Sequence, residues 1–304
     1  MEFDVIIDCC LLDFEVDHFI DPADNKHLLS VVNDFEEGSW RYQKFENFVW
    51  DNIAETALSY LEREALVSQP FSLLRSAAQN LRLTDSDKDP SQGSELAEIV
   101  LYGLMKHRFN ALPVVPKIFY KQNAQDTAKG ADSVHIVTHA DGTFSLWCGE
   151  AKFYNSIEDA RLGSIVQSVR NSLDPEKLRK ENSIVTSVSD IDHLDIDDEL
   201  REKIRSALSN QASLDTIKPI LNIPILVLHE CEITAAQETM TSEYIEAIAA
   251  NHKERAVAYF SKQLEQLADI HLYSQITFHL ILFPVPEKEP IVEKFLIDVG
   301  HHKE

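Results

Sequence analysis

One stretch of the sequence, residues 131–154, constrains the fold more than any other, because it reads as two apolar strands joined by a tight turn. Asp141-Gly142 lies between the two apolar runs, and this dipeptide is the strongest short-range signal for a β-hairpin. Side chains alternate along a strand, so Glu150 and Lys152 are expected to project from the same face. The second strand of the hairpin therefore carries a carboxylate and an ammonium side by side.

Asp132 opens the first strand, and the turn is expected to fold it back beside the Glu150 end of the second strand. One small patch is then predicted to hold Asp132, Glu150 and Lys152. Two neighbouring carboxylates suit a hard cation such as Mg²⁺, which accepts oxygen ligands and leaves positions for phosphate oxygens. A lysine beside them can orient or deprotonate an attacking water and offset the charge that develops on phosphorus. These residue types indicate metal-dependent hydrolysis of a phosphodiester.

The tripeptide Glu150-Ala151-Lys152 is short, and a second acid-x-Lys tripeptide, Asp24-Asn25-Lys26, occurs earlier in the chain. A motif of this length is informative only in its structural context. Glu150-Ala151-Lys152 lies in a strong strand pattern, faces an acidic residue across a hairpin and precedes a helix-like segment. The alternative interpretation is a solvated ion pair between Glu150 and Lys152, with Asp132 as a turn residue.

The pattern resembles the PD-(D/E)xK nuclease fold: Asp132 is followed eighteen residues later by Glu150-Ala151-Lys152, and a predicted helix with Glu95 and Glu98 precedes both. More narrowly, residues 130–135 and 147–154 resemble the HamA nuclease effector of Hachiman antiphage defence systems. The resemblance covers roughly residues 90 to 300. It implies an α/β fold, namely a restriction-endonuclease-like core with a mixed β-sheet flanked by helices.

The same resemblance implies metal-dependent DNA cleavage and a HamB-type helicase as partner. Asp132 and Glu150 would then hold one or two Mg²⁺ ions, with Mn²⁺ as the alternative cofactor. Glu98 would add a metal ligand directly or through water, and Lys152 would activate the water. Glu98 is assigned this role because it borders the apolar stripe of its helix, whereas Glu95 fits an N-terminal acid favoured by the helix dipole.

Net charge restricts how such a chain can engage DNA. The sequence has 51 acidic and 28 basic residues, which gives a net charge of −23. Lys and Arg side chains supply most non-specific affinity for nucleic acid, so most of this surface should repel DNA. We therefore expect a partner to deliver the DNA, or a small basic strip to attract it locally.

The 304 residues can form one large domain or two. The polar loop Thr84–Gly93 predicts a helix-rich N-terminal region over residues 1–90 and a nuclease-like core over residues 91–304, with an acidic insertion near residues 183–218. No apolar run approaches the length of a membrane span, and the start lacks the basic segment of a signal peptide. A cytoplasmic protein without a membrane partner is expected. The four cysteines lack metal-ligand spacing and are expected to be free thiols.

Hydrophobic periodicity predicts the remaining elements. Helices are expected over residues 44–66, 70–81, 94–109, 156–173, 241–269 and 290–299, and strands over 3–16, 114–121, 223–229 and 275–283. An aromatic stripe in the first helix (Phe45, Phe48 and Trp50) is expected to pack in the core. The N-terminal helices around Phe45 to Leu81 are nevertheless the candidate surface for docking the partner.

Two other functions remain open at this point. The first is a non-catalytic sensor or inhibitory subunit that keeps the nuclease fold and docks its acidic surface on a helicase. The complete set of Asp132, Glu150 and Lys152 disfavours it, because a decayed site loses a ligand or the lysine. The second is a phosphodiesterase for small substrates, which is disfavoured because no Gly-rich phosphate loop is visible.

Overall fold

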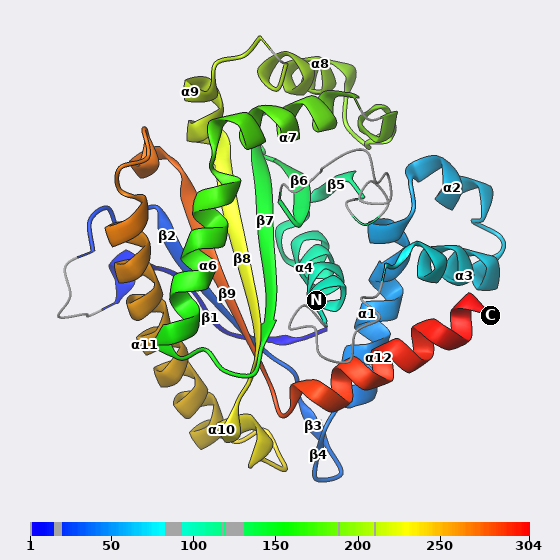
Figure 1. Cartoon of the computed structure of the whole chain (residues 1–304), viewed down its shortest axis with the longest axis vertical. Coiled ribbons are helices and arrows are strands. Elements are labelled where there is room, and N and C mark those ends of the chain that lie inside the picture. The colour runs from blue at the N-terminus through cyan, green and yellow to red at the C-terminus, as the bar shows by residue number, and fades with distance from the viewer. Residues whose placement is uncertain are drawn as a thin grey trace.

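A computed structural model describes residues 2–14, 20–82, 93–116, 118, 131–187, 189–209 and 211–304, with only the backbone described at 160, 182–187, 189 and 190. Its centre is a seven-stranded mixed sheet in the order β1-β2-β9-β8-β7-β6-β5 (Figure 1). The strands of this sheet are β1 (Asp4–Cys10), β2 (Lys26–Val32), β5 (Leu112–Val115), β6 (Ser133–Thr138), β7 (Phe144–Tyr154), β8 (Leu221–Glu230) and β9 (Thr277–Val285). Two short strands, β3 (Phe35–Glu36) and β4 (Ser39–Trp40), pair separately.

Strands β2, β9, β8 and β7 run parallel to one another, and the antiparallel strands β1, β6 and β5 complete the sheet at its two ends. Helices cover both faces of the parallel part, so its strands are buried on both sides. This explains why β8 is an almost continuous apolar run rather than an alternating one. The mixed sheet flanked by helices confirms the predicted α/β fold class.

The helices α6 (Asp159–Ser172) and α11 (Ser242–Leu267) pack on one face of the sheet. The opposite face is covered by α1 (Tyr42–Ala57), α4 (Ser94–Phe109) and α12 (Lys288–Lys303), with α3 (Pro70–Asn80) against α1 and α12. The remaining α-helices are α2 (Tyr60–Ala65), α7 (Pro175–Ser187), α8 (Asp198–Ala207), α9 (Leu214–Ile217) and α10 (Glu232–Ala235). The 3₁₀ turns are η1 (Leu11–Asp13), η2 (Ser189–His193), η3 (Lys218–Ile220) and η4 (Tyr273–Gln275).

None of the described helices combines the length and the apolar character needed to cross a membrane. The four cysteines are free thiols, as expected; Cys148 and Cys231 are buried, whereas Cys9 and Cys10 are partly exposed.

The helix predicted over residues 44–66 is in fact two helices, α1 and α2, which meet at Ser59. The Ser59 hydroxyl accepts the backbone N–H of Glu62 at 3.4 Å, and the Glu62 carboxylate accepts the backbone N–H of Ser59 at 2.9 Å. This reciprocal capping box starts a new helix at a point where the helical spacing of apolar residues continues without a break. Within α1, Phe45 and Phe48 are buried as predicted, and Trp50 is half-buried.

The predicted boundary near residue 90 does not separate the strands of the sheet. Residues 4–32 supply β1 and β2, and β2 pairs directly with β9 from the C-terminal part of the chain. The N-terminal region is therefore helical only from α1 to α3, and its first strands belong to the core sheet. Parallel pairing with a distant strand leaves no local signal in the sequence, which explains the difference. Apart from Gly93, the loop proposed as the boundary lies outside the described residues.

The predicted acidic insertion forms α7 to η3 at one end of the molecule (Figure 1). In α8, basic side chains offset part of the negative charge. Arg201 pairs with Asp198, and Lys203 pairs with Glu199 at 2.8 Å. Both pairs join residues three or four positions apart, where helical side chains are neighbours. The acidic side chains of this helix are exposed, as predicted for a solvated face.

Candidate active site

The predicted hairpin is present as β6 and β7, which pair antiparallel from Ser133–Gly149 to Thr138–Phe144. Gly142 adopts a φ of +75° in the turn, a conformation that glycine reaches without strain. The Asp141 carboxylate accepts the backbone N–H of Thr143 at 3.0 Å and its hydroxyl at 2.6 Å. These local interactions fix the register of the two strands.

This register places Asp132 beside Glu150, as predicted. The Asp132 backbone N–H donates to the Gly149 carbonyl at 2.7 Å, and Asp132 Oδ2 accepts the Ala151 N–H at 3.0 Å. Lys152 Nζ lies 3.4 Å from Asp132 Oδ2 and 3.1 Å from Glu150 Oε2. One ammonium therefore contacts both carboxylates.

The alternation of side chains along β7 also follows the prediction. Trp147, Ala151 and Phe153 pack into the core on the α4 side of the sheet. Glu150 points to the other face, where it meets α6. Two consecutive residues of β7 thus donate to the Asp132 carboxylate, Ala151 through its backbone N–H and Lys152 through its ammonium.

Ser168 is a site residue that the sequence reading missed. Its hydroxyl donates to Glu150 Oε2 at 2.8 Å, from the middle of α6. The available signal was its position, because Ser168 is a polar residue directly before the inward-facing Val169 in the helix that follows β7. Since α6 returns along β7, such a residue reaches the strand side chains.

Gly149 allows β6, β7 and α4 to approach one another closely. A Cβ atom at this position would lie 2.4 Å from Ser133 Oγ and 2.8 Å from Leu101 Cδ2. Contacts this short would force the strand or the helix to move. The absence of a side chain at Gly149 therefore keeps Asp132 within reach of its two partners.

The edge of β7 is open beyond Gly149. Ser133, the first residue of β6, pairs with Gly149, whereas residues 150–154 pair with β8 on their other side. Within the described residues no strand covers residues 150–154 on the β6 side. The three charged side chains stand where this edge begins.

The electrostatics of the site are set by burial and by two like charges. The side chains of Glu150, Asp132 and Lys152 are 6%, 16% and 26% exposed. Burial and the Asp132 charge raise the pKa of Glu150, although Lys152 and Ser168 partly oppose the shift. Burial acts to lower the pKa of Lys152, but the Asp132 and Glu150 carboxylates outweigh it and raise that pKa. Lys152 is therefore a stable cation at neutral pH.

The donor set fits a divalent cation. Two carboxylates converge on a single Lys152 Nζ, and this one positive charge faces two negative ones in a mostly buried place. Hard oxygen ligands of this kind are the ones that Mg²⁺ and Mn²⁺ bind. Asp132 and Glu150 are thus the residues that would hold the metal.

Glu98 lies on a different element from the other predicted ligands. It is buried on α4, which packs on the face of the sheet opposite α6, with Leu101 one turn later against Gly149. Among the described residues no cluster of three or more His, Cys, Asp or Glu side chains is arranged to hold a metal ion. Coordination of a metal by Glu98, directly or through water, stays a prediction.

Comparison with known proteins agrees with the fold. No curated protein sequence matches the chain. The family model of HamA matches residues 6–297, which include most of β1, all of β2, the hairpin with Asp132 and Glu150, and the first part of α12. The match therefore spans nearly the whole chain rather than the motif alone. The chain belongs to the HamA family.

Proposed function

We propose that the protein is the metal-dependent DNA nuclease effector of a Hachiman antiphage defence system, and that it hydrolyses phosphodiester bonds under the control of a HamB-type helicase. Membership of the HamA family associates the chain with Hachiman defence. The observation that carries the enzymatic part is the contact of Lys152 Nζ with both Asp132 and Glu150 at the open edge of β7. Such a set of two carboxylates and a lysine serves phosphodiester hydrolysis.

Each residue has a role in this proposal. Asp132 and Glu150 hold Mg²⁺, which when bound polarises the phosphate and lowers the pKa of a coordinated water. The Ala151 N–H and the Ser168 hydroxyl orient one oxygen of each carboxylate. In the reaction a water molecule gives up a proton to solvent as its oxygen forms a bond to phosphorus, the bond from phosphorus to the leaving oxygen breaks, and the leaving oxygen takes up a proton from solvent.

Lys152 acts in this scheme as a charge rather than as a base. Its pKa is raised by the two carboxylates, so it stays protonated near neutral pH. An ammonium fixed beside the phosphate stabilises the negative charge that grows in the transition state. It also donates hydrogen bonds that can orient the attacking water.

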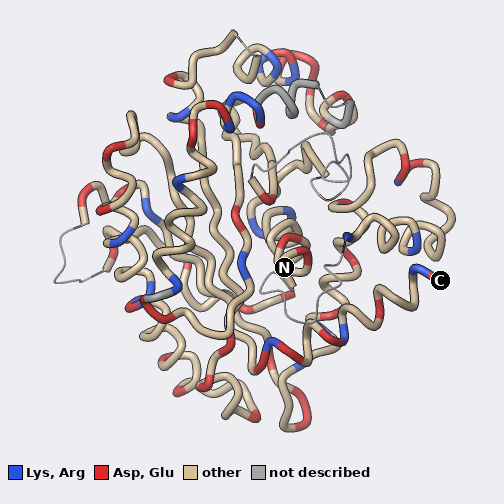
Figure 2. Tube along the Cα trace, in the orientation of Figure 1, with Lys and Arg blue, Asp and Glu red and all other residues tan. Residues whose placement is uncertain are grey.

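Control by a partner follows from the charge of the chain. The net charge is −23, and Figure 2 shows acidic residues on most elements with fewer basic ones among them. Each missing phosphate contact removes part of a salt-sensitive affinity. A nuclease that recruits DNA poorly by itself is harmless to its host until a translocating helicase supplies the strands.

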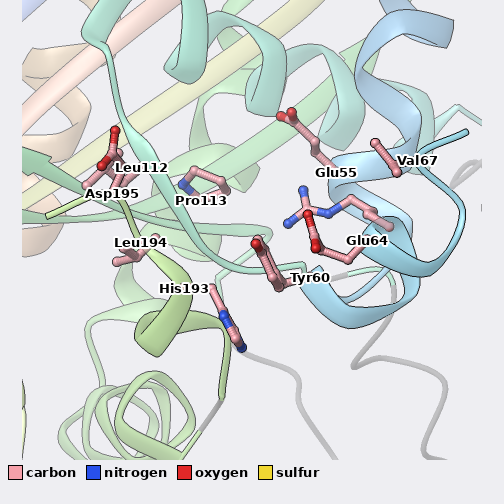
Figure 3. Close-up of a pocket in the computed structure, with 10 residues that line it drawn as sticks. Glu55, Tyr60, Glu64, Val67, Leu112, Pro113, His193, Leu194 and Asp195 are labelled. Carbon is pink, nitrogen blue, oxygen red and sulfur yellow. The ribbon is translucent and has the colours of Figure 1, made fainter.

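The N-terminal helices offer a surface for that partner, although the residues differ from the aromatic stripe of α1. Leu61, Val67 and Phe71 are 59%, 78% and 65% exposed, and they lie within eleven residues of one another. A cavity of about 360 Å³ adjoins Val67 (Figure 3). On its other side the Tyr60 ring stacks on His193, with centroids 4.1 Å apart. Clustered apolar side chains of this kind mark interaction surfaces.

The deciding experiment is to incubate the purified protein with supercoiled plasmid and Mg²⁺, with and without the neighbouring helicase. Cutting that requires Mg²⁺ and is lost in Glu150→Gln supports the nuclease. The alternative function, a non-catalytic subunit that docks on a helicase, predicts a stable complex but no cutting by either preparation.

A further inference from the structure

Two basic side chains stand at the far end of the open edge of β7. Lys288, at the start of α12, donates from Nζ to the Phe153 carbonyl at 2.9 Å and lies 5.3 Å from the centre of the Phe153 ring. Arg161, in the first turns of α6, places its guanidinium 5.7 Å from the centre of the Tyr154 ring. Both cations are thus held by neutral groups of β7.

These contacts lie on the same strand as the candidate active site. Residues advance about 3.3 Å along a strand, so Tyr154 lies about 7 Å beyond Lys152. The Ala151 N–H and the Phe153 carbonyl both point to the open side of β7, where Asp132 and Lys288 respectively bind them. The open edge therefore runs from the two carboxylates directly to the two cations.

Neither Arg161 nor Lys288 takes part in an ion pair within the described residues. Two nearby arginines do form ion pairs. Arg170, on the same helix as Arg161, binds both oxygens of Asp269 at 2.8 and 2.7 Å. Arg255 pairs with Asp159 at 3.1 Å. Asp269 and Asp159 are thus paired with other arginines, and no carboxylate of the described residues forms an ion pair with Arg161 or Lys288.

The carboxylate of Glu230, which lies near Lys288, already has other hydrogen-bond donors. Glu230 Oε1 accepts the backbone N–H of Lys288 at 2.8 Å and the amide of Asn155 at 3.4 Å, so it binds the start of α12 rather than the ammonium. Burial lowers the pKa of Lys288, Glu230 opposes this, and the nearby charge of Arg161 lowers that pKa further. Two like charges that affect each other in this way are stabilised when an anion binds near both.

We propose that Lys288 and Arg161 bind phosphate groups that neighbour the one cut at Asp132 and Glu150, so that a nucleic-acid strand lies along the open edge of β7. The inference rests on the proposed nuclease function and names the residues that position its substrate. It also gives an otherwise acidic protein a short basic strip, defined by Lys152, Arg161 and Lys288, at the one place where DNA must arrive.

The test measures binding of a short DNA duplex in a Glu150→Gln background, so that cutting does not interfere. The salt concentration is varied from about 50 to 200 mM, a range over which phosphate contacts change affinity strongly. Lys288→Gln and Arg161→Gln should each reduce the slope of log affinity against log salt by about 0.9, and they should weaken all sequences equally. Lys288→Arg keeps the charge and should keep the slope.

Lys253→Gln is the matched control. Lys253 is also exposed and lies 5.6 Å from the centre of an aromatic ring, that of Phe14, which follows β1 at the other end of the sheet. Slopes for Lys288→Gln and Arg161→Gln equal to that of this control would overturn the proposal, as would a parent protein that does not bind DNA even at about 50 mM salt.

A cutting assay separates this inference from the function on which it rests. With Glu150 intact, Lys288→Gln and Arg161→Gln should raise KM and leave kcat nearly unchanged, since they remove binding shared by the ground state and the transition state. Cutting with an unchanged KM and an unchanged slope would refute the phosphate strip and keep the nuclease. Binding that depends on both cations in a protein that never cuts would refute the nuclease and keep the strip.

Discussion

The Nζ atom of Lys152 lies 3.1 Å from Oε2 of Glu150, two residues earlier on the same strand, in a place where both side chains are mostly shielded from water. The pair is stable without substrate, because the ammonium offsets part of the repulsion between Glu150 and Asp132. Removing either member therefore changes the charge of the site more than it changes the packing of the sheet.

Glu150→Gln and Lys152→Ala are each expected to reduce DNA cutting by about a hundredfold or more, the size of effect that a positioned catalytic group supplies. The sheet and the partner interaction should persist, which circular dichroism and co-purification will show. Glu265→Gln changes an exposed glutamate on α11 and serves as the control. Cutting by both site variants at the rate of this control would remove the site from consideration.

EDTA should abolish cutting, and added Mg²⁺ or Mn²⁺ should restore it. Ca²⁺ should bind without supporting turnover. Binding itself is measured by the rise in melting temperature with added metal, since a ligand that binds only the folded state stabilises it. Asp132→Asn should lose this rise. Full activity in EDTA would refute the metal mechanism.

Ser168→Ala removes the hydroxyl that donates to Glu150 at 2.8 Å, and a hydrogen bond to a charged group contributes about 1.5–3 kcal/mol. We expect cutting to slow by roughly tenfold or more, while Ser168→Thr retains a hydroxyl and most of the activity. Ser164→Ala, on an exposed part of the same helix, is the control. Equal rates for Ser168→Ala and this control would show that the hydroxyl has no role in the site.

His135→Phe should stabilise the protein, increasingly so in acid. His135 is fully buried against the Tyr102 ring, and among the described residues neither ring nitrogen has a hydrogen-bond partner. Burial lowers its pKa to about 3, so the unfolded chain takes up a proton below about pH 6.5 while the folded chain does not. The wild type therefore loses stability as pH falls from 6.5 toward 3.

At pH 5 the advantage of His135→Phe over the wild type should exceed its advantage at pH 8 by about 2 kcal/mol, because each pH unit in this window corresponds to about 1.4 kcal/mol. Urea unfolding at the two pH values measures the difference. His139→Phe, in the exposed hairpin turn, is the comparison and should show no such growth. A constant advantage at both pH values would contradict the assignment of a neutral buried imidazole.

Phe71→Asp and Val67→Asp are expected to weaken the complex with the helicase by at least about tenfold, as apolar anchors at an interface typically do. Leu12→Asp is the control, because Leu12 is 63% exposed but lies beside β1, away from α2 and α3. Co-purification from cells that express both proteins measures the effect. Normal recovery of the complex with Phe71→Asp and Val67→Asp would place the docking surface elsewhere.

The hairpin that carries the candidate site was predictable because its determinants are local. Asp141-Gly142 fixes the turn, and a period of two residues then fixes which side chains meet. Ser168 and the strand β2 were missed for the opposite reason. The one polar residue inside β2 that bonds to a distant group is Ser30, whose Oγ lies 2.7 Å from His252 Nδ1 on α11 in the part of the chain that the structure describes. The residues next to β2 in the sequence do not form an alternating pattern that would have predicted a buried strand there.

The two acid-x-Lys tripeptides show that structural context decides the role of the lysine. Lys26 is fully buried, and its ammonium donates to Asn25 Oδ1 at 2.9 Å, so it is committed to the structure of its own turn. Lys152 instead contacts two carboxylates at an open strand edge. Identical spacing thus yields a structural lysine in one place and a candidate catalytic lysine in the other. The position of Glu98 was set by which face α4 covers, a property of tertiary packing that helix periodicity does not contain.

The order of strands in the sheet also bears on when the sheet that carries the candidate site is completed during synthesis. The last strand to leave the ribosome, β9, is inserted between β2 and β8, near the middle of the sheet. Until residue 285 has emerged, β2 has no parallel partner and β8 has one exposed side. Pairings between such distant segments form slowly and late. A growing chain, or one that ends before β9, therefore carries Asp132, Glu150 and Lys152 on an incomplete sheet, and the candidate site is supported by the complete sheet only after β9 has paired with β2 and β8.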